Sequence, residues 1–150
     1  ERCFVRLLGD MRSYNYVFNI TPDFDNEQYR IKAIDFDQQF YEGKRILYLP
    51  QFIKENTPLV TLCMELLTKE NVLQYQLEER ALMKRRIIAS SVRLRSLFGA
   101  IVKEKLSNDL KIGQLTNELN THFSTDLYSD SKGMGEILRR HLNHLLDTKL

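Results

Sequence analysis

The segment GDMRSYNYVFNITPDFDNEQYRIKAIDFD, from Gly9 to Asp37, contains two short apolar stretches separated by a loop. Tyr16–Ile20 and Arg30–Ile34 are rich in the aromatic and β-branched residues that are typical of strands. The proline, aspartates and asparagine between them favour a turn. The segment therefore predicts an antiparallel β-hairpin with its tip near Asp25.

A tip at Asp25 predicts the register of this hairpin. Opposed residues then have numbers that sum to 50, which pairs Val17 with Ala33 and Asn15 with Asp35. Opposed residues lie on the same face with their Cβ atoms about 5 Å apart. A shift of one residue would put Asn15 and Asp35 on opposite faces, so the expected pairing depends on this register.

Asn15 and Asp35 carry oxygen donors of the kind that a hard divalent cation prefers. Mg²⁺ takes one or two protein carboxylates and completes its coordination with water and phosphate oxygens. Asp10 lies five residues before Asn15 in the sequence. A short loop can bring its carboxylate to the same pocket, where it would accept a proton or orient a nucleophile.

The order Asp, four residues, Asn, strand, turn and IDFD resembles the catalytic core of the protein-kinase-like fold, nearer to the aminoglycoside, choline and other atypical kinases. The resemblance implies that Asp10 is the catalytic aspartate, that Asn15 and Asp35 bind the metal, and that Arg12 takes the place of a phosphate-steadying lysine. Asp37 is either a second metal ligand or an exposed carboxylate at a strand end. The implied cofactors are ATP and Mg²⁺, and the implied activity is phosphoryl transfer to an acceptor that the sequence does not identify.

The rest of the chain predicts an α+β fold that is mainly helical, with a catalytic-loop hairpin packed on a helical bundle as in a kinase C-terminal lobe. We expect one domain over residues 1–150, with a hairpin region at about 1–50 and a helical region at about 56–148. Short apolar runs predict further strands at Cys3–Leu8 and Arg45–Leu49. Apolar periodicity predicts helices at about 59–67, 70–106 with a bend near Lys69 or Gly99, 112–123, and 132–146 behind a Ser131 cap.

Composition excludes several classes of protein. The 22 Lys and Arg residues nearly balance the 20 Asp and Glu residues, so no strong positive field favours nucleic acid. No apolar run approaches the length of a membrane span. Cys3 and Cys63 have no metal-ligand spacing, which favours reduced core thiols and a cytoplasmic location.

Other interpretations stay open. IKAIDFD also resembles the Asp-x-Asp strand end of haloacid-dehalogenase-like phosphohydrolases, and the helices would also suit a non-catalytic pseudokinase or interaction module. A kinase would need a nucleotide-clamping N-terminal lobe elsewhere in a parent chain, so we expect the 150 residues alone to be inactive. His141 with His144, and the basic run Lys84–Arg86, are expected on solvated helix faces.

Overall fold

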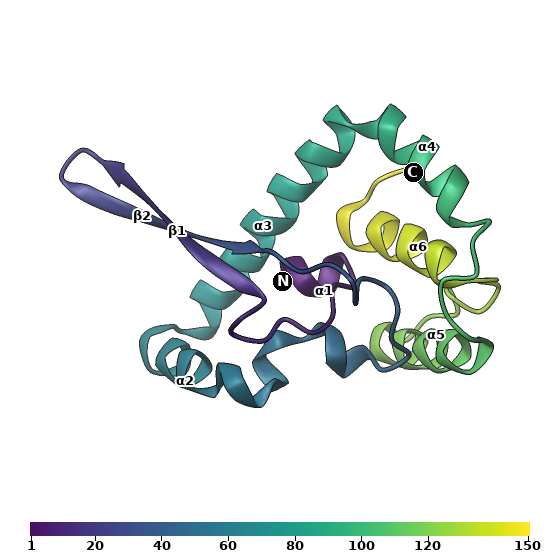
Figure 1. Ribbon diagram of the computed structural model, residues 1–150, viewed down its shortest axis with the longest axis horizontal. Helices are drawn as coiled ribbons and strands as arrows, with labels where there is room; N and C mark the ends of the chain where they lie inside the picture. Colours follow the sequence, from purple (N-terminus) through teal and green to yellow (C-terminus); the bar gives the residue numbers. More distant parts are fainter.

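The computed structural model describes all 150 residues and contains six α-helices and one two-stranded sheet (Figure 1). This confirms an α+β fold that is mainly helical. Three 3₁₀ turns, η1, η2 and η3, connect the hairpin region to the helical region. The bounds are α1 Arg2–Val5, β1 Tyr16–Asp23, β2 Asn26–Ala33, η1 Arg45–Tyr48, η2 Pro50–Phe52, η3 Lys54–Asn56, α2 Thr57–Leu66, α3 Lys69–Ala89, α4 Ser91–Ile101, α5 Asp109–Phe123 and α6 Met134–Leu146.

The hairpin is present, but its predicted register is wrong by one residue. Tyr16 pairs with Ala33 and Asp23 with Asn26, so opposed numbers sum to 49. The turn needs only two residues, and the left-handed backbone of Phe24 (φ 53°) closes it. Beyond the strands, Ile34 N–H donates to Asn15 O at 3.1 Å, so Asn15 lies opposite Ile34 and not Asp35.

The new register separates the hairpin into two unlike faces. Phe18 pairs with Ile31 and Ile20 with Tyr29 on one face, and all four side chains are exposed. The other face is mainly polar and carries Asn19, Thr21, Gln28, Arg30 and Lys32. Figure 1 shows the hairpin projecting beyond the helices, so its apolar face has no cover within this chain.

Two further strand predictions are wrong. Cys3–Leu8 begins as the short helix α1 and ends in a tight turn at Leu7, whose φ is 47°. Arg45–Leu49 forms the 3₁₀ turn η1. Both runs are short and continuously apolar, a pattern that does not distinguish a strand from a buried helical turn.

Helix α6 lies at the centre of the fold and contributes most to the hydrophobic core. Its buried face packs against α1, α3 and α4 (Figure 1), and Leu115 and Leu119 of α5 belong to the same core cluster. The core also includes Phe4 and Tyr48 from the N-terminal region. The core residues on α6 are Met134, Ile137, Leu138, Leu142 and Leu146.

The helical region differs in detail from its prediction. The long helical pattern is divided before Lys69 and again at Ser90, and Gly99 lies inside α4. Gly133, not Ser131, caps α6, and Ser131 Oγ is the only buried side-chain polar atom without a partner. No helix has both the length and the apolar character needed to cross a membrane.

The histidines and cysteines also depart from expectation. His141 is completely buried, whereas His144 is exposed as predicted. Both cysteines are free, but Cys3 is half-buried and Cys63 is exposed on α2, so the prediction that both are core thiols is wrong.

Candidate functional site

The site is built around a backbone bridge between two separate segments. Leu8 and Gln39 form an isolated antiparallel bridge, and Gly9 N–H donates to Gln38 O at 3.2 Å. A Cβ atom on Gly9 would lie 3.1 Å from that same oxygen, which explains why glycine suits this position. The bridge brings Asp10 next to the segment that carries Asp35 and Asp37.

Backbone strain is concentrated at this bridge. Leu7, Asp10 and Phe40 have φ values of 47°, 51° and 44°, a left-handed conformation that non-glycine residues rarely adopt. Such residues persist only where the surrounding structure holds them, and they are enriched at functional sites. At Asp10 the hold comes from two hydrogen bonds to its carbonyl oxygen, from Arg12 N–H at 2.9 Å and from Asn15 Nδ2 at 2.7 Å.

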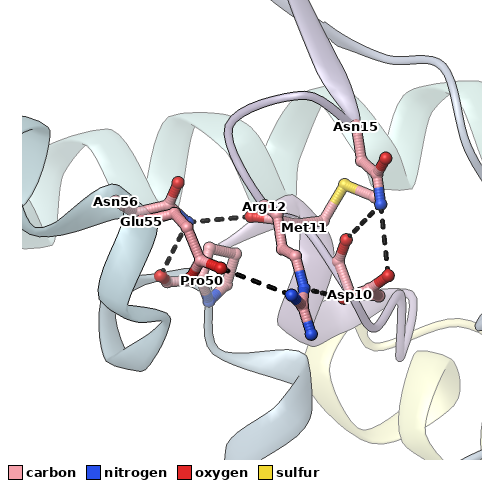
Figure 2. A network of polar contacts seen from close by, with 7 residues as sticks. All are labelled: Asp10, Met11, Arg12, Asn15, Pro50, Glu55 and Asn56. Atoms are coloured by element: carbon pink, nitrogen blue, oxygen red, sulfur yellow. Dashed lines mark hydrogen bonds and ion pairs between the residues drawn. The ribbon is translucent and has the colours of Figure 1, made fainter.

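Asn15 is buried and faces Asp10 (Figure 2). Besides the bond to the Asp10 carbonyl, Asn15 Nδ2 lies 3.3 Å from Asp10 Oδ2. The amide oxygen of Asn15 receives no hydrogen bond from the chain and is not among the buried unpaired atoms. This oxygen therefore remains available to bind a cation or to accept a hydrogen bond from a ligand.

Arg12 bridges two acids on the solvent side of the site (Figure 2). Its Nε donates to Asp10 Oδ1 at 2.7 Å, and its Nη1 donates to Glu55 Oε1 at 3.3 Å. These ion pairs raise the pKa of the guanidinium further. Arg12 thus places a permanent positive charge directly beside the Asp10 carboxylate.

Asp35 and Asp37 lie together after β2. Asp37 N–H donates to Asp35 Oδ1 at 3.2 Å. The pKa of Asp37 is raised by the loss of hydration around it, then by the negative charge of Asp35, by a hydrogen bond to that carboxyl group and by the charge of Asp10. The charge of Asp10 thus reaches the pair Asp35 and Asp37, and a bound cation would relieve the repulsion within this pair.

The structure brings the five candidate residues together as two groups, one of three residues and one of two. Asp10 contacts Asn15 and Arg12, and Asp37 contacts Asp35. The two groups meet through the bridge at Gly9 and the influence of Asp10 on Asp37. The expected strand pairing of Asn15 with Asp35 is not the way in which they approach.

Asn56 is a functional candidate that sequence reasoning missed. Its side chain is buried, and its Nδ2 donates to Met11 O at 2.8 Å and to Pro50 O at 2.9 Å (Figure 2). Its Oδ1 accepts from Tyr16 Oη at 3.1 Å. Asn56 therefore fixes the loop between Asp10 and β1 onto the η2 and η3 turns.

The local sequence around Asn56 indicates a different role for this residue, that of a helix cap. Asn56 precedes Thr-Pro at the start of α2, which is a typical helix cap. The side chain makes no capping hydrogen bond and turns inward instead. Its long-range partners could not be read from local spacing.

A cavity of about 370 Å³ opens beside Asp10 and Arg12. Its wall combines acidic and apolar side chains from the segment between β2 and α2, none of which the sequence had singled out. The other lining residues are Gln38, Glu42, Leu47, Ile53 and Glu55. The side chain of Asp10 therefore lies at the wall of an open cavity.

No group of three or more His, Cys, Asp or Glu side chains is arranged to hold a metal ion by itself. The donors present are the free amide oxygen of Asn15 and the carboxylates of Asp35 and Asp37. Such a partial set suits Mg²⁺, which keeps several waters and shares its coordination with substrate phosphates.

Comparisons of the chain with models of protein families, with curated proteins and with solved structures give no match.

Proposed function

We propose that this chain is the catalytic lobe of a phosphotransferase that uses ATP and Mg²⁺. The observation that carries the proposal is the meeting of Asp10, Asn15 and the pair Asp35 and Asp37 around one strained backbone bridge. A hairpin whose ends have only a structural role would need none of these contacts. A site for in-line phosphoryl transfer needs a carboxylate for the acceptor, oxygen donors for a metal and a nearby positive charge.

Each residue has a defined role in this proposal. Asp10 lines the open cavity, so its carboxylate would orient the acceptor hydroxyl and take its proton. Arg12 lies beside it and would offset the charge that develops on the transferred phosphoryl group.

Asn15, Asp35 and Asp37 are the proposed metal ligands. When bound there, Mg²⁺ would neutralise part of the negative charge of the nucleotide phosphates. The raised pKa of Asp37 has a direct consequence for binding. Because protonated Asp37 is a poor ligand, metal affinity should fall as the pH decreases through the pKa of this residue.

The hairpin supports the proposal of a second, nucleotide-clamping lobe in a parent chain. The exposed apolar face of Phe18, Ile20, Tyr29 and Ile31 projects away from the helices. A nucleotide-clamping lobe would cover this face, and because a kinase needs such a lobe we expect the 150 residues alone to be inactive. The free thiols of Cys3 and Cys63 agree with a reducing, cytoplasmic location.

Nucleotide binding by the full-length protein tests the proposal. Isothermal titration calorimetry with MgADP should detect binding to the wild type and to Asp10→Asn, because Asp10 contacts the acceptor and not the nucleotide. Asp35→Ala should lose binding. The matched control Asp23→Ala, at the hairpin tip, should bind as the wild type does.

Two other outcomes would replace the proposal. A covalent aspartyl phosphate on Asp35 would indicate a phosphohydrolase of the haloacid-dehalogenase type. Absence of MgADP binding by a folded wild-type protein would indicate a pseudokinase without nucleotide or a helical interaction module. The extensive exposed apolar surface favours the interaction module as the second candidate.

A further inference from the structure

A second cavity, of about 280 Å³, is lined by residues of α3, α4 and α6. It shares no lining residue with the cavity at Asp10. Its wall is mainly aliphatic, with contributions from all three helices. These aliphatic side chains include Ile87, Leu94, Leu97, Ile101, Leu138 and Leu142.

Two arginines are the only charged residues that line this cavity. Arg6 comes from the segment after α1, and Arg86 comes from α3. The side chain of neither residue makes an ion pair or a hydrogen bond. The ion pairs of the protein use Arg2, Arg12, Arg80, Lys84, Lys105 and Lys111 instead.

Arg6 is held in an environment that disfavours its charge. Its guanidinium lies over the ring of Phe36, 5.3 Å from the ring centroid. Burial lowers the pKa of Arg6, and no carboxylate offsets the effect. Partly buried charges without a partner are costly, so an anion at this position would be stabilised.

We propose that this cavity binds a small amphipathic carboxylate, such as a short fatty acid. The apolar chain would lie against the aliphatic wall, and the carboxylate would accept hydrogen bonds from Arg6 and Arg86. Guanidinium groups recognise carboxylates through paired, charge-assisted hydrogen bonds. Small-ligand sites are typically apolar cavities of about 300–1,000 Å³ with a few polar groups at one side, and this one is near the lower limit of size.

The site is independent of the proposed phosphoryl chemistry. None of its aliphatic residues belongs to the candidate metal or acceptor site. Gln39 and Phe40, which line this cavity, also belong to the backbone bridge beside Asp10, and Arg6 contacts Phe36, which lies between Asp35 and Asp37 in the chain. A ligand can therefore be tested with the metal site empty or mutated.

Titration of the 150-residue chain with octanoate, followed by methyl NMR, tests the proposal. The signals of Ile87 and Ile101 should shift, whereas that of Ile20 on the hairpin should not. Octylammonium has the same chain and the opposite charge, and it should bind at least about tenfold more weakly because it would meet two guanidinium groups. Equal binding of the two probes, or shifts confined to Ile20, would overturn the proposal.

Substitutions of the two arginines test where the carboxylate of octanoate binds. Arg6→Gln and Arg86→Gln should each weaken octanoate binding about tenfold, as expected for the loss of a hydrogen bond to a charged group. Arg85→Gln is the matched control, since Arg85 is exposed beside Arg86 but does not line the cavity. If Arg6→Gln does not fold, Leu97→Glu provides a second test, because this half-exposed wall position would then repel the carboxylate. Unchanged octanoate affinity in Arg86→Gln and Leu97→Glu would refute the assignment.

Discussion

At the scale of the residue, the hydrogen bonds of a few buried polar side chains join segments that are distant in the sequence. Asn15 and Asn56 fix the loop that carries Asp10, and His141 joins the N-terminal segment to α6. The proximity of Asp10 and Asn15 could be predicted because the two residues are only five positions apart in the sequence, whereas the expected pairing of Asn15 with Asp35 is wrong. The contacts of Asn56 and Glu55 could not be predicted, because their partners lie about forty positions away in the chain.

Asn56 should be a stabilising residue as well as a positioning one. Asn56→Ala leaves Met11 O, Pro50 O and Tyr16 Oη without their partner. Unpaired buried polar groups are costly, so we expect the free energy of unfolding to fall by about 2–3 kcal/mol. Urea denaturation measures this loss, and Asn19→Ala on the exposed hairpin is the control. A loss no larger than that of the control would show that Asn56 does not fix the loop.

His141 should make the stability of the protein depend on acid pH. Its ring bonds to Tyr128 Oη at 2.9 Å and to Phe4 O at 3.0 Å. Burial lowers the pKa of His141 to about 4, whereas an unfolded histidine titrates near 6.5. Between these values the unfolded chain binds more protons, so stability should rise with pH through this window and be lost on acidification, by about 3 kcal/mol in total.

The test of His141 compares the pH dependence of unfolding in two variants. His141→Gln should be less stable at pH 7 but should lose most of the dependence between pH 4 and 6.5. His144→Gln, which changes an exposed residue of the same helix, should keep it. An unaltered pH profile in His141→Gln would mean that other groups cause the acid sensitivity.

At the scale of the element, the strength of the local pattern decides what could be predicted. The hairpin and the last two helices combine periodicity with turn or cap residues over ten or more positions, and these elements exist where expected. Cys3–Leu8 and Arg45–Leu49 are too short to show a period, and tertiary packing of Phe4 and Tyr48 makes them helical turns. The register of the hairpin depends on the length of its turn. The turn has two residues, so the observed register differs from the predicted one by one position.

Two helical glycines should respond to alanine in opposite directions. Gly113, inside α5, has open space where a Cβ atom would lie, so Gly113→Ala should raise the free energy of unfolding by about 0.5–1 kcal/mol. A Cβ atom on Gly135 would lie 2.6 Å from Ile101 Cγ2 and 3.3 Å from the Ile101 backbone. Gly135→Ala should therefore separate α6 from α4 and cost about 1–3 kcal/mol.

Thermal and urea unfolding of both glycine variants measures these effects. Because the two changes add the same methyl group, each serves as the control for the other. Stabilisation by Gly135→Ala would contradict the close packing of α4 on α6. Destabilisation by Gly113→Ala would mean that α5 has a partner on its exposed side.

At the scale of the whole molecule, the protein exposes an unusual amount of surface. Its accessible area is 10,238 Å² and only 24 of 150 residues are buried, whereas a compact monomer of this mass would expose about 8,000 Å². The excess is larger than the area that one partner typically buries in a stable protein interface, about 800 Å². Sequence composition could not show this, because the apolar fraction is ordinary and only the fold reveals which residues lack cover.

The central claim is that Asp10, Asn15, Asp35 and Asp37 surround one cation site. Paramagnetic broadening of backbone NMR signals by substoichiometric Mn²⁺, a substitute for Mg²⁺, tests it most directly on the 150-residue chain. We predict selective broadening at Asp10, Asn15, Asp35 and Asp37, its removal by excess Mg²⁺, and its loss in Asp35→Ala. Broadening centred on other acidic residues, such as Asp23 and Asp25 at the hairpin tip, or equal broadening in Asp35→Ala, would contradict the claim.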